Sequence, residues 1–150
     1  MKKLILIISL LLLITTTSCI SKKIKTFEKD EAKAFLELAN EYNTKMDHNY
    51  VLIDLRELNT KYKEGHFFGF INYDIKNGSL ENLQNKLKNH HYSKSIFLID
   101  ESGEDVEKVA NFLKEIGYKK IYIYLGGYSQ LVTVNDNYFT ITTGTKDCDC

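Results

Sequence analysis

The residues with the greatest chemical potential form an acidic loop, Asp100-Glu101-Ser102-Gly103-Glu104-Asp105. The loop directly follows the apolar run Ser95–Ile99, which is typical of a strand buried on both faces. Apolar residues then recur at helical spacing as far as Gly117, a residue type that often ends a helix. At the carboxyl end of a parallel strand, the N–H groups that open the next helix can hold an anion. The position therefore suits an anion, yet the loop already carries negative side chains.

Two cysteines near the end of the chain are a second candidate for chemistry. Cys148 and Cys150 lie in the segment Asp147-Cys148-Asp149-Cys150. Outside the cytoplasm such thiols tend to oxidise, although a Cys-x-Cys disulfide is tight. They could also bind a metal with the intervening acids, exchange thiols with a partner, or belong to a flexible tail without a catalytic role. The sequence leaves these alternatives open.

Alternating strands and helices position these residues. The apolar patterns predict strands at Tyr50–Leu55, around Phe70 and Ile71, at Ser95–Ile99, at Lys120–Leu125 and at Tyr138–Thr142, and helices at Phe27–Tyr42, Ser79–Lys88 and Val106–Ile116. Glu57–Glu64 is predicted as a helical turn, and Tyr128–Val134 as a short helix or a final strand. This alternation predicts a single α/β domain with a parallel sheet.

Composition narrows the class of function. The chain has 150 residues, and its 20 basic and 20 acidic residues give a net charge near zero. A broad basic field for nucleic acid is therefore not expected. The hydrophobic share of 43% is that of a globular domain rather than of a disordered chain.

The N-terminus has the three parts of a signal peptide: a basic start at Lys2 and Lys3, an apolar run over Leu4–Ile14, and small polar residues before Cys19. The apolar run is shorter than the ~20 residues that a spanning helix needs. A cysteine after small residues resembles the lipidation site of bacterial lipoproteins, although Thr16 replaces the usual aliphatic residue. An ordinary secreted protein and a membrane anchor are the alternatives. We therefore divide the chain into a signal peptide (1–18), a lipidated Cys19 with a polar tether (19–26), a domain (27–142) and a cysteine-containing tail (143–150).

Four sequence pieces, in order, resemble the rhodanese-like domain. They are LIDLRE (Leu52–Glu57), EGHFFGFIN (Glu64–Asn72), the strand–loop–helix from Ile96 to Gly117, and IYIYLGGYSQL (Ile121–Leu131). The resemblance implies a three-layer sandwich, a mainly parallel sheet with helices on both faces. It also assigns structural roles to Asp54 with Arg56, to Glu64, Gly65 and His66, and to the turn Gly126-Gly127. For His66, a hydrogen-bonded neutral ring is preferred to a metal ligand, because no second ligand stands at suitable spacing.

The acidic loop departs from this family. Active members carry a cysteine where this chain has Asp100, and its thiolate accepts a sulfur atom to become a persulfide. No cysteine occurs between Cys19 and Cys148, and Glu101, Glu104 and Asp105 would repel anionic substrates. Asp100 is then expected to accept the loop N–H groups itself, which would lower its pKa. Binding of calcium or magnesium by the acids, or a nucleophilic role for Asp100, are the alternatives.

These inferences predict a catalytically inactive rhodanese-like lipoprotein that binds or scaffolds at the bacterial cell envelope. The expected partners are an unidentified protein and, through the lipid on Cys19, the membrane; no nucleic acid, metal or cofactor is expected. One alternative is a sulfurtransferase that works through Cys148 or Cys150, and another is a divalent-cation-binding protein. Phe67, Phe68 and Phe70 are expected either in the core or in an exposed patch for a partner, with the core preferred.

Overall fold

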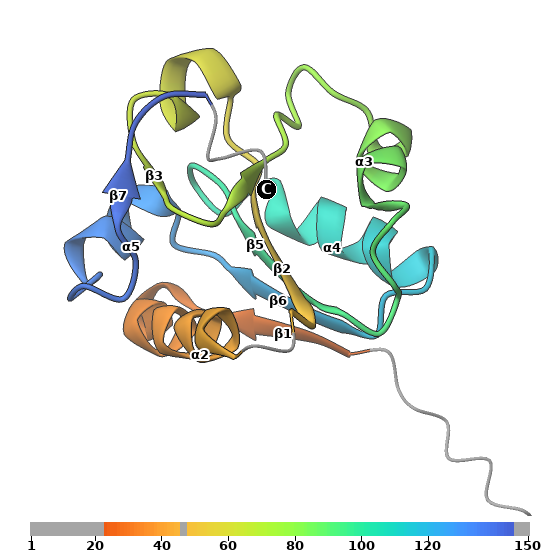
Figure 1. Cartoon of the computed structure of the whole chain (residues 1–150), viewed down its shortest axis with the longest axis horizontal. Coiled ribbons are helices and arrows are strands. Elements are labelled where there is room, and N and C mark those ends of the chain that lie inside the picture. Colours follow the sequence, from red (N-terminus) through yellow and green to blue (C-terminus); the bar gives the residue numbers. More distant parts are fainter. Residues whose placement is uncertain (1–22, 46–47, 146–150) are drawn as a thin grey trace, which may run out of the picture.

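A five-stranded, wholly parallel sheet forms the centre of the protein in a computed structural model that describes residues 23–45 and 48–145 (Figure 1). The strand order is β1-β6-β5-β2-β4. The strands are β1 (Lys23–Phe27), β2 (Tyr50–Asp54), β4 (Ile71–Asn72), β5 (Ser95–Ile99) and β6 (Lys120–Tyr124). The central strand β5 is buried along its whole length, as its almost wholly apolar sequence predicts.

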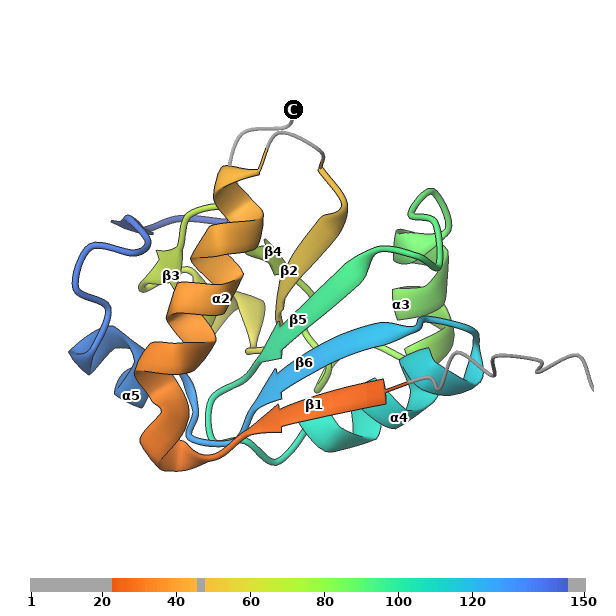
Figure 2. The ribbon, with the colours of Figure 1, turned by 90° about the horizontal axis from the view of Figure 1, so that it is seen from below.

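Helices cover both faces of the sheet, which confirms the predicted α/β sandwich (Figures 1 and 2). Helices α2 (Ala32–Thr44) and α5 (Tyr128–Thr133) share one hydrophobic cluster, and α3 (Leu80–Leu87) and α4 (Val106–Glu115) share the other. Neighbouring residues of a strand belong to opposite clusters: Phe97 packs with α2, and Leu98 packs with α4. Residues 23–145 therefore contain both cores and the complete sheet.

The first strand corrects one sequence-based prediction. The segment up to Thr26 was expected to be a polar tether, but Lys23–Phe27 forms edge strand β1 and pairs with β6 from Lys23↔Lys120 to Phe27↔Tyr124. Ile24 and Phe27 supply the apolar contacts of this strand, and its polar residues remain at the surface. The following helix consequently begins later than predicted, with a 3-10 turn at Lys29–Glu31 and then α2 from Ala32.

A small second sheet closes one side of the domain. It pairs β3 (His66–Phe67) with β7 (Ile141–Thr142) in antiparallel fashion. The predicted strand at Tyr138–Thr142 is therefore shorter, because residues from Asn135 to Phe139 form a turn that the Asn135 side chain holds. The predicted helical turn after β2 is a π-helical turn at Leu58–Tyr62. Phe67 and Phe70 are buried in the core, whereas Phe68 is 52% exposed.

None of the helices in residues 23–45 and 48–145 is long and apolar enough to cross a membrane. The predicted signal peptide, Cys19, Cys148 and Cys150 lie outside the described residues.

Candidate functional site

The candidate site lies at the carboxyl edge of the sheet, because all five parallel strands end there (Figure 2). Three segments meet at this edge: the residues after β2, the acidic loop after β5, and the glycine turn after β6. The backbone joins the last two, since the Tyr128 N–H donates to the Asp100 carbonyl at 2.9 Å. The parallel topology thus brings together residues that are far apart in the sequence.

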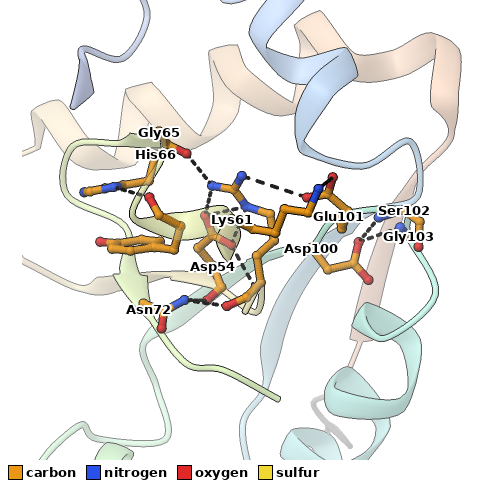
Figure 3. A network of polar contacts seen from close by, with 11 residues as sticks. Asp54, Lys61, Gly65, His66, Asn72, Asp100, Glu101, Ser102 and Gly103 are labelled. Atoms are coloured by element: carbon orange, nitrogen blue, oxygen red, sulfur yellow. Dashed lines mark hydrogen bonds and ion pairs between the residues drawn. The ribbon is translucent and has the colours of Figure 1, made fainter. Parts of the chain in front are cut away.

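Asp100 holds its own loop through both carboxyl oxygens, and Figure 3 shows the contacts with Ser102 and Gly103. Its Oδ1 accepts the N–H groups of Ser102 at 3.2 Å and Gly103 at 2.5 Å. Its Oδ2 accepts the N–H of Asp105 at 2.7 Å. The Asp100 residue is only 3% exposed. In the structure, Asp100 therefore accepts the loop N–H groups, as predicted.

The predicted effect on the pKa of Asp100 is wrong in sign. Burial removes water from the carboxylate and raises its pKa, and the N–H donors of Asp105 and Gly103 oppose this rise only in part. The nearby Asp105 carboxylate adds to the rise by like-charge repulsion. The sequence pattern indicated the donors but contained no measure of how deeply Asp100 is buried.

Two glycines allow the acidic loop to pack directly against the turn after β6. Gly103 has φ +88° and Gly127 has φ +79°, a region that side chains disfavour. A Cβ on Gly103 would collide with the Leu125 carbonyl, and one on Gly127 with the Glu101 carbonyl. The loop is therefore closed by backbone-to-backbone contact.

The acidic side chains of this loop point to different neighbours. Glu101 lies 4.0 Å from the Arg56 guanidinium and 3.5 Å from the Lys61 ammonium group. Glu104 is exposed, and Asp105 is engaged through its backbone N–H. Within the described residues, no three His, Cys, Asp or Glu side chains are placed to hold a metal ion.

Asp54 and Arg56 form a buried ion pair at the end of β2. The Arg56 Nη2 donates to Asp54 Oδ2 at 2.7 Å, and its Nε donates to Oδ1 at 3.0 Å. The two side chains are 0% and 3% exposed, respectively. Arg56 also donates to the Gly65 carbonyl at 2.8 Å, and its guanidinium lies 3.4 Å from the ring centre of Tyr128. This pair ties β2 to the segment before β3 and to α5.

Asn72 extends the same network to β4. Its side-chain amide donates to the backbone carbonyls of Asp54 at 3.2 Å and Arg56 at 2.8 Å. Both ends of the turn after β2 are thereby fixed (Figure 3). No local sequence pattern indicated Asn72, because its partners lie 16 to 18 residues away.

His66 is buried and hydrogen-bonded. Its Nδ1 lies 2.9 Å from the Tyr62 carbonyl, and its ring stacks on the Tyr62 ring with the centroids 3.7 Å apart. A carbonyl oxygen only accepts, so Nδ1 carries the hydrogen. Its neighbour Glu64 is exposed, and Gly65 contributes its carbonyl to Arg56. The segment Glu64–His66 thus supports the turn after β2 through its backbone and the His66 ring.

A shallow hollow of about 270 Å³ opens beside the loop. Its lining combines two cations, two acids and an aromatic ring: Arg56, Lys61, Glu64, Glu101 and Tyr128. Asp100 does not line this hollow. The Tyr128 hydroxyl is buried and has no hydrogen-bond partner among the described residues. Tyr128 was not predicted as a site residue, because its place over Arg56 follows only from the tertiary fold.

Comparison with known proteins identifies the family. The model of the rhodanese-like domain matches residues 33–133, which is more than half of the chain. No curated protein matches the sequence.

Several solved structures share the fold. The Alr3790 protein from Anabaena is 15% identical, with a TM-score of 0.57, over 72% of this chain and 80% of that one. CoADR-RHD of Bacillus anthracis is 26% identical with a TM-score of 0.52, over 78% of this chain but 18% of that chain. The single-domain sulfurtransferase RDL2 of Saccharomyces cerevisiae is 15% identical with a TM-score of 0.51, over 75% of this chain and 91% of that one. Together with the match to the family model, the parallel sheet and its covering helices establish that the chain belongs to the rhodanese-like domain family.

Proposed function

We propose that this protein is a rhodanese-like lipoprotein of the bacterial cell envelope that binds a protein partner and does not transfer sulfur. The observation that supports the proposal is the Asp100 carboxyl group, which occupies the N–H donors of Ser102, Gly103 and Asp105. A substrate anion in this loop would have to displace it. A carboxylate also has no sulfur with which to form a persulfide.

The surface beside the hollow suits a protein partner better than a small anion. Its cations are already balanced, since Arg56 pairs with Asp54, and Lys61 lies near Glu101. One exposed apolar side chain lies close to the hollow: Ile141 on β7, at 45% exposure, neighbours Gly65, which is part of the lining. A mixture of charged and apolar groups on one face is typical of a protein interface.

A sulfur-transfer assay tests this proposal directly. In such a reaction, a thiolate attacks the outer sulfur of thiosulfate, sulfite leaves, and cyanide then removes the bound sulfur as thiocyanate. We would measure thiocyanate with residues 20–150 as wild type, as Asp100→Cys and as Cys148→Ser/Cys150→Ser. We expect no turnover above background in the wild type. Any turnover in the wild type would contradict the proposal, and turnover that the double serine variant also shows would in addition require chemistry without any thiol.

One observation favours a second candidate function, sulfur transfer through the tail thiols. The Gly144 N–H donates to the Lys63 carbonyl at 2.9 Å, beside Glu64, which lines the hollow. Cys148 follows Gly144 by four residues, and a chain extends at most ~3.6 Å per residue. This candidate predicts wild-type turnover that disappears in Cys148→Ser/Cys150→Ser, whereas the binding function predicts no turnover in either protein.

A further inference from the structure

The net charge near zero conceals two poles of opposite sign. Three neighbouring strands begin at or directly after a lysine: β1 at Lys23, β6 at Lys120 with Lys119 before it, and β5 at Ser95, directly after Lys94. The segments that follow the strands at the opposite edge carry more acids than cations: Glu28, Asp30, Glu57, Glu101, Glu104 and Asp105 against Lys29, Arg56 and Lys61. The amino edge of the sheet is therefore basic, and the carboxyl edge, which holds the candidate site, is acidic.

The basic pole contains a groove of about 410 Å³, here called the lysine groove. It is lined by Lys23, Lys25, Lys119 and Lys120, with Ile121 and Tyr122 between them. The four lysines are exposed, and none forms an ion pair with an acidic side chain in the described part of the chain. Long lysine side chains contribute apolar stems to such a groove while their ammonium groups stay in water. The groove therefore suits an anionic group attached to an apolar body.

The sheet register places like charges side by side. Lys23 is the direct partner of Lys120, and Lys25 is the partner of Tyr122. In parallel strands such partners project to the same face, and adjacent like charges repel one another. Helix α2 crosses the other end of this face and leaves the first residues of β1 and β6 beside it uncovered (Figure 2). An anion in the groove would relieve this repulsion.

The position of the groove in the chain indicates which anion it meets. Cys19, the predicted lipidation site, precedes Lys23 by four residues. At ~3.6 Å per residue, even a fully extended segment keeps Lys23 within about 14 Å of a lipid-bound Cys19. The surface potential of an anionic membrane acts over a distance of this order, with a Debye length of about 8 Å at physiological salt.

We infer that the lysine groove docks on the anionic phospholipid surface to which the chain is tethered. This contact would orient the domain, since the acidic carboxyl edge lies at the far end of the strands from the groove. The candidate site would then face away from the membrane. The inference extends the proposed envelope location, and the assay below omits the lipid, so that its failure would leave the lipidation proposal standing.

Vesicle binding by residues 20–150, which retain both hydrophobic cores, tests the inference. The probes are vesicles of phosphatidylcholine alone and of phosphatidylcholine with phosphatidylglycerol. We expect binding to the anionic vesicles only, and we expect added salt to weaken it. Lys23→Gln/Lys25→Gln/Lys119→Gln/Lys120→Gln should lower the partition coefficient, by up to about fivefold per lysine. Equal binding of the wild type to both vesicles would overturn the inference.

A charge-matched variant separates the effect of the groove lysines from the effect of net charge. Lys33→Gln/Lys63→Gln/Lys76→Gln/Lys108→Gln removes the same charge from exposed lysines that lie outside the groove. We expect it to bind the anionic vesicles like the wild type, with circular dichroism showing that both variants are folded. Equal loss of binding in the two variants would refute a specific groove. Tighter binding of the wild type to a DNA oligonucleotide than to the vesicles would also refute it.

A measurement on the unaltered protein gives an independent answer. Acetylation of lysines by a water-soluble reagent, followed by mass spectrometry, reports which amines the vesicles cover. We expect anionic vesicles to slow the acetylation of Lys23, Lys119 and Lys120 severalfold, and to leave Lys61 and Lys63 unchanged. Uniform slowing, or none, would contradict docking through the groove.

Discussion

The buried pair of Asp54 and Arg56 allows a quantitative prediction for Arg56→Ala. This change leaves the Asp54 carboxylate, which is 0% exposed, without its cation. Breaking one partner of a buried ion pair typically costs about 3–5 kcal/mol. The lost hydrogen bond to Gly65 and the lost contact with the Tyr128 ring add to this cost, although such terms do not sum fully. We expect the free energy of unfolding to fall by about 5 kcal/mol, a large part of the 5–15 kcal/mol typical of a small domain.

Urea unfolding followed by circular dichroism would measure this loss in residues 20–150. Arg56→Lys retains the charge but not the planar guanidinium group, so this variant should fold, with a free energy of unfolding lower by about 2 kcal/mol. A cycle of Asp54→Ala, Arg56→Ala and the double variant should give a coupling energy of about 3 kcal/mol. The exposed pair of Lys33 and Asp136, with 4.0 Å between its charged atoms, is the matched control and should couple by under about 0.5 kcal/mol. If Arg56→Ala costs less than about 1 kcal/mol, or if the two cycles agree, the pair does not hold this edge.

Three further changes test the same edge of the sheet. Because burial raises the pKa of Asp100 above its ordinary value, the folded state binds a proton more tightly than the unfolded chain. The contribution of Asp100 to stability should therefore fall as the pH rises from about 4 through the raised pKa. It is measured as the difference in urea midpoint between the wild type and Asp100→Asn, because the lowered pKa values of Asp74 and Glu81 act in the opposite direction in both proteins; a difference that rises with pH would mean a lowered pKa of Asp100. Gly103→Ala should lower the free energy of unfolding by several kcal/mol (~3) in the same assay, because its Cβ would meet the Leu125 carbonyl at positive φ. An unchanged urea midpoint would show that the loop is not closed. Tyr128→Phe should be neutral or stabilising by about 1 kcal/mol, because it removes a buried hydroxyl without a partner; a loss above about 1 kcal/mol would reveal a partner for that hydroxyl.

The sequence predicts the central strands because their environment is uniform. Tyr50–Asp54 and Ser95–Ile99 are mostly apolar on both faces, the pattern typical of a parallel strand between two helical layers. Edge strand β1 escapes prediction for the opposite reason. Its sequence Lys-Ile-Lys-Thr-Phe is mostly polar, since Lys23, Lys25 and Thr26 stay at the surface, and its pairing partner β6 lies about a hundred residues further along the chain.

The candidate site is predictable to a similar extent. Asp54, Arg56 and Asp100 are visible as polar residues at the carboxyl ends of apolar strands. Asn72 and Tyr128 are not, because their contacts with the turn after β2 arise only when the strands pair and α5 packs. The sign of the pKa shift of Asp100 is likewise not predictable from the sequence. It depends on a balance between burial and donated hydrogen bonds, and only the folded structure sets that balance.

The closed acidic loop and the lysine groove are separate features with a shared consequence. The loop satisfies its own N–H groups, so this end of the domain can stay ordered without a bound anion. The lysine groove, in contrast, leaves four cations without acidic partners among the described residues. An anionic surface would therefore attract the groove and repel the loop, and both forces turn the domain in the same sense. If the domain is the tethered binding module proposed above, it would gain from this orientation, because its hollow would then face the compartment from which a partner must approach.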